Sequence, residues 1–285
     1  MSYRIEKGEG LASSLGRIAS EEMDLALTEL RRRDRGEAIH SVRKAIKRLR
    51  ALLRSLRVAF PKKLFRAEDQ RLAEAGRKMS PLRDVHVQLR TLGKLRAAKD
   101  SAGGRAHRDL LRQQENFTRK IPVLRRAVRR MLGGSRGSIE SWPLAKTTPA
   151  ILSAGLKRVY AQGRKAFRTA CKSPTPENLH EWRKKAKSLG YGFELIESVA
   201  PKEFSKRIPM CQALGDALGD DHDLFMVQQA LGGASRSQPS PDDAGLARRI
   251  AARRSKLQKK ALRLGKKVFR ENTRAFAKCL DWHLE

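Results

Sequence analysis

The chain has 285 residues, of which 63 are Lys or Arg and 30 are Asp or Glu, so its formal net charge is +33. Apolar residues make up 40% of the sequence, which is enough to build a core and excludes a disordered basic tail. The charge favours a polyanionic partner, and an aromatic content of 5% argues against a surface that stacks single-stranded bases.

Almost every segment between helix-breaking residues is predicted to be a helix. In the first half we expect helices at 11–33, 36–60, 62–78 and 82–98, and a longer one at 105–132. Pro122 should kink or divide the longer helix, because proline donates no backbone hydrogen bond. The Gly-, Ser- and Pro-rich stretch at 133–149 is predicted to be a loop. It divides the chain into two expected helical halves, at 1–140 and 141–285.

The second half is predicted to contain helices at 150–171 and 177–199, shorter ones at 201–217 and 221–231, and a long basic one at 242–284. A flexible loop is expected at 232–241. No alternating β-branched run demands a strand, so the predicted fold class is all-α. No membrane-spanning segment and no N-terminal targeting segment is found, and Cys171, Cys211 and Cys279 form no CxxC pair. These features predict a soluble cytoplasmic protein without a disulfide framework.

Two short motifs occur in both halves in the same order, which predicts an internal duplication. Residues 39–49 (IHSVRKAIKRL) align with residues 179–189 (LHEWRKKAKSL), sharing the pattern HxxRKxxK. Residues 82–86 (LRDVH) align with residues 218–222 (LGDDH), sharing Leu, Asp and His.

Each HxxRKxxK segment is predicted to form a helix with one apolar and one basic face. Apolar residues recur at 39, 42, 46, 49, 53 and 56 and at 179, 182, 186, 189, 193 and 196, the spacing of a buried helix face. A basic stripe about 21 Å long, at ~1.5 Å per residue, runs beside the first apolar face. It contains His40, Arg43, Lys47, Arg50 and Arg54. The second half repeats it with His180, Arg183 and Lys187, and Lys44 and Lys184 lie on the outer flank.

The crowding of positive charge predicts an anionic ligand. Like charges three or four residues apart repel by a few tenths of a kcal/mol per pair, and the first motif helix has no Glu after Glu37 to relieve them. A linear polyphosphate carries a charge on every unit and offers no bases to recognise. Arg side chains can bind its oxygens in pairs, and Lys adds point charges.

The histidines admit other interpretations. His40, His86, His180 and His222 could converge with Asp84 and Asp220 as a metal site, but the surrounding Arg and Lys oppose a cation and no His pair has i,i+4 spacing. No metal or other cofactor is therefore expected. His40 and His180 lie on the stripe and are the better ligand contacts, whereas His86 and His222 fit a capping or core role equally well. No Walker loop or Arg-His-Gly phosphatase motif is present, so no enzymatic activity is expected.

The doubled HxxRKxxK and Leu-x-Asp-x-His motifs resemble the CHAD family, the conserved-histidine α-helical domains, over roughly residues 11–284. The resemblance implies two helical bundles around a central basic channel that binds inorganic polyphosphate, in proteins found at polyphosphate granules. It implies that the channel is lined by His40, Arg43, Lys44, Lys47, Arg50, His180, Arg183, Lys184 and Lys187. Secondary candidates are Arg48, Arg83, His86 and His222.

The second motif departs from the family pattern at two positions. Gly190 stands at the counterpart of Arg50 and Ser188 at that of Arg48, so the second half should contribute fewer contacts. The main alternative is a nucleic-acid-binding protein that reads phosphates without sequence preference, using the same stripe and the basic segment 248–270.

Overall fold

The computed structural model describes residues 2–32, 35–95, 102–200, 202–234 and 241–280, and this part of the chain is helical without any β-strand. The predicted all-α fold class is confirmed. The helices are α1 (Leu11–Glu29), α2 (Arg35–Ser55), α3 (Lys62–Lys78), α4 (Ser80–Lys94), α5 (Ala102–Ser138), α6 (Pro149–Lys172), α7 (Pro176–Ile196), α8 (Lys202–Ala234), α9 (Pro241–Val268) and α10 (Thr273–Lys278), with 3-10 turns at Ile139–Ser141 and Leu144–Lys146. Among the described residues no helix is both long and apolar enough to cross a membrane.

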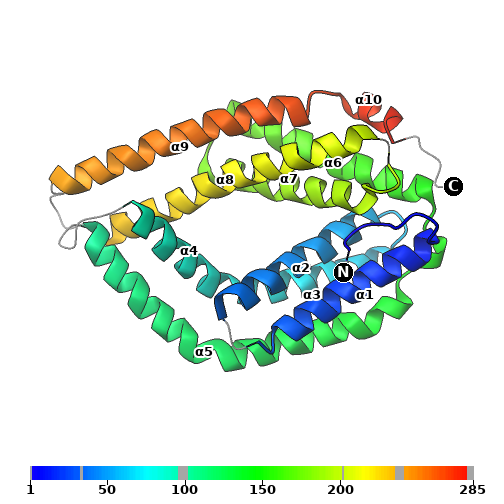
Figure 1. Ribbon diagram of the computed structural model, residues 1–285, viewed down its shortest axis with the longest axis horizontal. Helices are drawn as coiled ribbons and strands as arrows, with labels where there is room; N and C mark the ends of the chain where they lie inside the picture. The colour runs from blue at the N-terminus through cyan, green and yellow to red at the C-terminus, as the bar shows by residue number, and fades with distance from the viewer. Residues whose placement is uncertain (1, 33–34, 96–101, 201, 235–240, 281–285) are drawn as a thin grey trace.

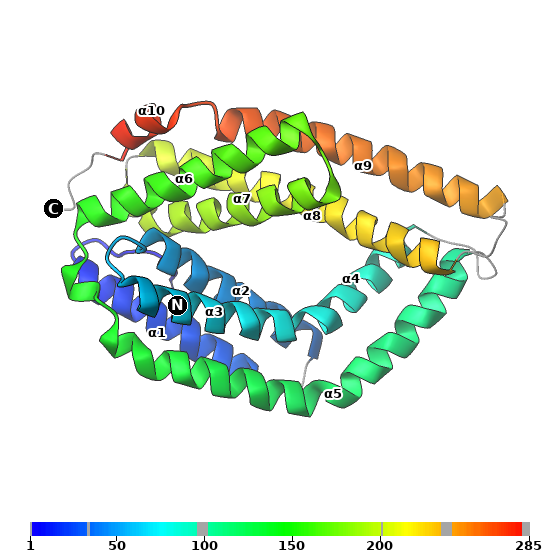
Figure 2. The ribbon, with the colours of Figure 1, turned by 180° about the vertical axis from the view of Figure 1, so that it is seen from behind.

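The two motif helices, α2 and α7, lie side by side in the middle of the molecule and run in the same direction (Figures 1 and 2). α2 also packs against α1, α3 and α6, and α7 packs against α6 and α8. α8 runs back along α7, and α9 covers α8 (Figure 1). The basic faces of the two motif helices are therefore placed near each other by the fold.

The predicted apolar faces of α2 and α7 are buried. None of their twelve residues is more than 4% exposed, and Leu49, Leu53 and Leu189 are completely buried. Burial of a Leu or Phe side chain contributes roughly 1.5–3 kcal/mol, so these faces stabilise the packing of both helices. One continuous apolar cluster contains residues of both expected halves, from Tyr3 to Leu280. The two halves thus share a core.

A second, smaller apolar cluster holds α4 against α8. Val85 of α4 packs there with Leu224 of α8, Leu110 of α5 and Ile250 of α9. This cluster lies where the far ends of these four helices meet, at the left of Figure 1. It holds α4 against the C-terminal part of α8.

Some predicted helix boundaries are wrong. α5 continues through Pro122 and the glycine pair at 133–134 to Ser138, because Leu132 and Ser135 are buried by packing on α1 and α3. The predicted loop at 133–149 is therefore confined to about 139–148. Of the two outcomes expected at Pro122, a kink or a division, the division does not occur, and α5 is one helix that bends in its middle part (Figure 2).

α8 is one helix, not two. A break was predicted between 217 and 221. This segment is helical because Leu214, Leu218 and Asp221 are buried between α7 and α9, and this packing stabilises the helix. The predicted helix at 242–284 ends at Val268, and α10 begins after Asn272, whose side chain accepts a hydrogen bond from the Ala275 amide. The predicted ends at 33, 96–98 and 281–284 and most of the loop at 232–241 fall outside the described residues.

Candidate functional site

Basic side chains of α2, α4 and α7 gather where α2 packs beside α7. The positive charges that act on Lys47 of α2 come from all three helices. We call this group the basic cluster: Arg43, Lys47, Arg83, Arg183 and Lys187. Basic residues at equivalent positions of the two motifs, Arg43 and Arg183 and Lys47 and Lys187, thus belong to one group. Arg83, a secondary candidate, belongs to the same group.

The cluster is crowded enough to disfavour protonation of Lys47. Loss of hydration, followed by the charges of Arg43 and Arg183, lowers the pKa of Lys47 to about 7. The side chain is nevertheless exposed to solvent, so an anion can reach it. Desolvation likewise lowers the pKa of Lys187, and the charge of Arg183 adds to this effect. Each of these ammonium groups would hold its proton more strongly beside an anion.

Most of this charge has no acidic partner. Lys47, Arg83 and Arg183 form no ion pair within the described part of the chain, and the buried Nε of Arg183 has no hydrogen-bond partner. Lys187 lies 3.5 Å from the largely exposed carboxylate of Asp216. An exposed pair of this kind contributes about 0–1 kcal/mol and leaves the ammonium available to another anion.

Arg43 differs from the rest of the cluster because its guanidinium is already engaged. Its Nη1 donates hydrogen bonds to the carbonyl oxygen of Gly76, 2.9 Å away, and to the hydroxyl of Ser80. Arg43 therefore ties α2 to the junction of α3 and α4. Its role is at least partly structural, although its charge still acts on the cluster.

Two carboxylates lie at the edge of the cluster. Desolvation raises the pKa of Asp84 on α4, while the charges of Arg43 and His222 oppose the shift. Desolvation also raises the pKa of Asp223 on α8, against the opposing charges of Arg183 and Arg83. Neither carboxylate is within ion-pair distance of a basic side chain in the described residues. Asp223 was not a sequence candidate, and Asp84 was considered only as a metal ligand.

Two of the four motif histidines form a pair beside the cluster. The rings of His180 and His222 have centroids 4.3 Å apart, so the two motifs of the second half meet in space. Desolvation, followed by the charge of His222, lowers the pKa of His180 to about 4, and its buried Nδ1 has no hydrogen-bond partner. Desolvation also lowers the pKa of His222. Both rings are therefore neutral near pH 7.

The first-half histidines are arranged differently. His40 is exposed, and desolvation followed by the charges of Arg83 and Lys47 lowers its pKa. Lys187 of the other half also acts on His40, so this ring lies near the basic cluster. His86 is exposed on α4, and among the described residues no ring contact joins it to His40. The described residues contain no grouping of three or more His, Cys, Asp or Glu side chains suited to hold a metal ion.

Two glycines of α8 make room for the basic side chains of α7. A β-carbon at Gly219 would lie 3.2 Å from Nε of Arg183, and one at Gly215 would lie 3.0 Å from Cγ of Lys187. Both distances are shorter than ordinary van der Waals contact. The stems of Arg183 and Lys187 thus lie directly on the α8 backbone. The sequence analysis did not predict this contact. Its sign in the sequence is the spacing of Gly215 and Gly219, which are four residues apart and therefore share one face of the helix.

The C-terminal part of the predicted stripe on α2 lies in a separate ion-pair group. Arg50 forms two hydrogen bonds with the carboxylate of Asp69 on α3, of 2.8 and 3.0 Å, and Arg54 lies 3.6 Å from the same carboxylate. Lys184 pairs with Glu181 at 3.1 Å. These three candidates are therefore partly neutralised and are not in the basic cluster.

Two further candidates complete the set. Arg48 binds Glu22 at 2.8 Å and Glu194 at 3.3 Å, and its guanidinium lies 4.8 Å from the ring centre of Tyr3. It joins α1, α2 and α7. Lys44 is exposed, and its charge acts on His40 and on Glu22.

The departures at positions 188 and 190 have a packing explanation. Gly190 is buried, and a β-carbon there would lie 3.2 Å from the β-carbon of Cys211 on α8. Ser188 is also buried, where an arginine would have to displace its neighbours. α7 and α8 therefore approach too closely at Gly190 for a second copy of Arg50, and burial leaves no room at Ser188 for a second copy of Arg48.

Comparison with known proteins gives one family and several structural neighbours. The model of the CHAD domain matches residues 17–232. The chain is similar to the crystal structure of the CHAD domain from the plant Ricinus communis, with a TM-score of 0.61 and 16% identity over 98% of this chain and 94% of that one. It is also similar to PptA from Streptomyces chartreusis, with a TM-score of 0.54 and 16% identity over 92% of this chain and 98% of that one. No curated protein matches the sequence.

Proposed function

This chain belongs to the CHAD domain family, and from that premise and the basic cluster we propose that it binds inorganic polyphosphate without acting on it chemically. The observation that carries the proposal is the convergence of five basic side chains from α2, α4 and α7, which outnumber the nearby carboxylates of Asp84, Asp216 and Asp223. Such a site is electrostatically unfavourable when empty, and an anion with closely spaced charges relieves the repulsion.

The arrangement favours a linear polyphosphate over an isolated phosphate ion. Lys47, Arg83, Arg183 and Lys187 come from three helices and each can contact a different phosphoryl group. Arg83 and Arg183 can each bind two oxygens, while Lys47 and Lys187 act as point charges. His40 and the pair of His180 and His222 lie at the margin, where protonation beside phosphate would add contacts.

Within this proposal the ligand-contacting set is narrower than the stripes alone suggested. Lys47, Arg83, Arg183 and Lys187 are its central members, and His40 lies at its margin. Arg50, Arg54 and Lys184 are engaged with carboxylates and would have a secondary role. The two halves, 1–140 and 141–285, would each supply one motif helix to one ligand. Polyphosphate granules would be a natural location for such a protein.

A nucleic-acid-binding function is the second candidate, because α9 presents a separate basic surface. Its exposed residues include Arg248, Arg249, Arg253, Lys256, Lys259, Lys260, Arg263, Lys266 and Lys267. A surface of this kind binds phosphates of any nucleic acid in a salt-dependent way. It does not require the convergence seen between α2 and α7.

A competition titration at fixed salt distinguishes the two functions. Long-chain polyphosphate should displace labelled duplex DNA readily, and DNA should fail to displace labelled polyphosphate at equal phosphate concentration. The reverse order of displacement would make nucleic acid the ligand. In a parallel incubation with divalent ions, the polyphosphate should keep its chain length, and shortened chains would contradict a purely binding role.

A further inference from the structure

A pocket of about 360 Å³ lies where the C-terminal end of α1 meets the middle of α5. This volume is at the lower end of the range, roughly 300–1,000 Å³, that is usual for small-molecule sites. Its wall contains four arginines, Arg31, Arg125, Arg126 and Arg129, and no acidic residue. The pocket shares no residue with the basic cluster. The pocket is lined by residues that follow α1 and by α5, whereas the basic cluster is formed by α2, α4 and α7.

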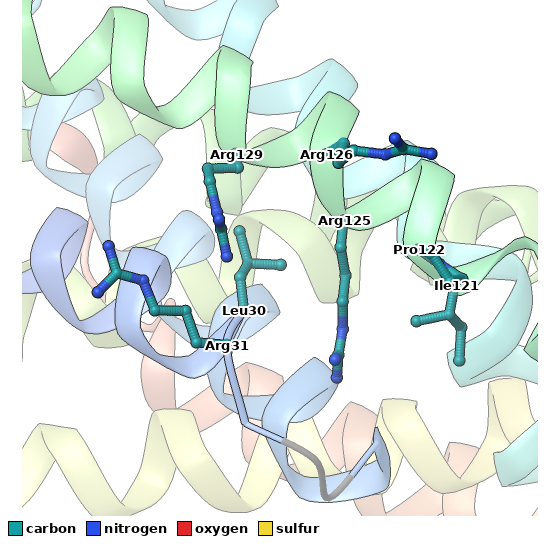
Figure 3. Close-up of a pocket in the computed structure, with 7 residues that line it drawn as sticks. All are labelled: Leu30, Arg31, Ile121, Pro122, Arg125, Arg126 and Arg129. Carbon is teal, nitrogen blue, oxygen red and sulfur yellow. The ribbon is translucent and has the colours of Figure 1, made fainter.

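The arginines of the pocket are available to a ligand. The side chains of Arg31, Arg126 and Arg129 form no hydrogen bond or ion pair within the described part of the chain. Arg125 differs, because its Nη2 donates a hydrogen bond of 2.7 Å to the carbonyl oxygen of Arg32. That bond joins α5 to the residues that follow α1 and fixes one wall. In Figure 3 the guanidinium of Arg129 lies beside Leu30, whereas Arg126 points away from it.

The rest of the lining is apolar. Leu30 and Ile121 are buried in the floor, and Pro122 of α5 is exposed. Val123, the next residue, is 60% exposed, which is unusual for a large apolar side chain in this molecule. Inorganic polyphosphate has no apolar part that could contact this part of the lining. A ligand that combines phosphate with a planar or apolar group would use both kinds of lining.

We propose that this pocket binds a small organic phosphate of about the size of a mononucleotide. Its phosphoryl groups would be held between Arg31 and Arg129, and its planar part would lie against the apolar part of the lining. Arginine suits both tasks, because the guanidinium binds two phosphate oxygens at once and also stacks on planar groups. The inference stands independently of polyphosphate binding at the basic cluster.

ATP and tripolyphosphate are the probes that test the proposal. Methyl NMR of Leu30 and Ile121 reports on the pocket alone, so a ligand at the basic cluster does not confuse the result. ATP should shift both methyl signals, and tripolyphosphate should bind here at least about fivefold more weakly than ATP, a difference of roughly 1 kcal/mol. Tripolyphosphate binding as tightly as ATP would overturn the assignment of an organic ligand, as would unchanged methyl signals with ATP.

Charge reversal supplies the matched control. Arg31→Glu with Arg129→Glu should weaken ATP binding at the pocket about tenfold or more, roughly 1.4 kcal/mol. Arg119→Glu with Arg130→Glu makes the same change of net charge on exposed side chains of α5 outside the pocket and should leave the affinity unchanged. Equal losses of ATP affinity in both variants would show that the net positive charge of the protein, and not this pocket, determines binding. If the first variant does not fold, Arg129→Gln alone gives the same comparison against Arg130→Gln.

Discussion

Arg183 lies directly across Gly219 of the neighbouring helix: a β-carbon at Gly219 would be 3.2 Å from Nε of Arg183 and 3.3 Å from Nη2. The guanidinium is therefore held between the basic face of α2 and the backbone of α8. It lacks a carboxylate partner at ion-pair distance in the described residues. This arrangement keeps a positive charge in place for a ligand and accounts for a glycine in the second Leu-x-Asp-x-His motif, where the first has Arg83.

Gly219→Ala should weaken polyphosphate binding while leaving the fold intact. The added methyl group displaces the Arg183 guanidinium by a few tenths of an ångström, so we expect a loss of roughly threefold to tenfold, or about 0.7–1.4 kcal/mol. Stability should hold or rise, because alanine is favoured over glycine in a helix by about 1 kcal/mol. Isothermal titration and thermal unfolding measure the two effects. Gly137→Ala is the control, since a β-carbon there meets nothing within 4 Å, and equal affinities in the two variants would contradict the role of Gly219.

Polyphosphate affinity should fall as the pH rises above 7. The pKa of Lys47 is about 7 in the empty protein, and a bound anion raises it. Binding then takes up a proton at pH values between the two pKa values, so affinity is highest below pH 7 and decreases by up to about tenfold per pH unit above it. Lys47→Arg keeps the charge at every pH and should flatten the profile between pH 7 and 9. A slope that is unchanged in this variant would assign the proton to another group.

The histidines should contribute little to this profile near neutral pH. The pKa of His180 is about 4 in the empty protein, so the onset near pH 6.5 expected from an unperturbed histidine does not apply to it. Any contribution of His180 requires the bound phosphate to raise its pKa by more than two units. His180→Gln should therefore leave the affinity at pH 8 unchanged, and a loss of more than about threefold there, roughly 0.7 kcal/mol, would contradict this.

Removing a charge from the empty cluster should stabilise the protein. The charged form of Lys47 is disfavoured in the fold, and this penalty is complete below its folded pKa of about 7 and disappears towards the unfolded value near 10.5. Lys47→Gln should thus raise the melting temperature at pH 6, by roughly 2 °C for about 1 kcal/mol, a value reduced for the solvent access of the side chain. The gain should shrink at pH 9 and reverse when polyphosphate is added, because only the parent protein is then stabilised by the ligand. A lower melting temperature of the variant at pH 6 without ligand would contradict the conclusion that positive charges are crowded around Lys47.

Arg50 and Arg183 should respond to substitution in opposite ways. Arg50 makes two hydrogen bonds to Asp69, so Arg50→Gln should lower stability by about 1 kcal/mol with little effect on binding. Arg183→Gln should weaken binding with little loss of stability, because no hydrogen bond or ion pair within the described residues is broken. Both changes remove one charge, which makes each the control for the other. Equal effects on binding would place both arginines at the ligand.

The local features of the motif helices could be predicted from the sequence, because helical periodicity determines which residues share a face. The apolar positions of α2 and α7 are all buried as expected, and the basic residues at 43, 47, 183 and 187 lie together. Helix ends were less predictable. Pro122 and the glycine pair at 133–134 lie inside the continuous helix α5, since burial on several neighbours outweighs the local preference of proline and glycine.

Which residues belong to the basic cluster depends on how the helices pack against one another. The periodicity of a single helix does not determine this packing. Arg50 and Arg54 share a stripe with Lys47, yet α3 supplies Asp69 to these two arginines and separates them from the cluster. Arg83 joins the cluster because the second apolar core holds α4 beside α8. Neither relationship can be read from the spacing of residues along α2 or α7.

The most direct test compares two double charge reversals by their affinity for labelled long-chain polyphosphate at physiological salt. Lys47→Glu with Arg183→Glu changes the basic cluster, and Lys256→Glu with Lys260→Glu makes the same change of charge on the exposed face of α9. The first variant should lose affinity by about 100-fold or more, roughly 2.7 kcal/mol, and the second by less than about threefold, with helix content unchanged in both. Equal losses, or a larger loss in the α9 variant, would contradict binding at the junction of α2 and α7.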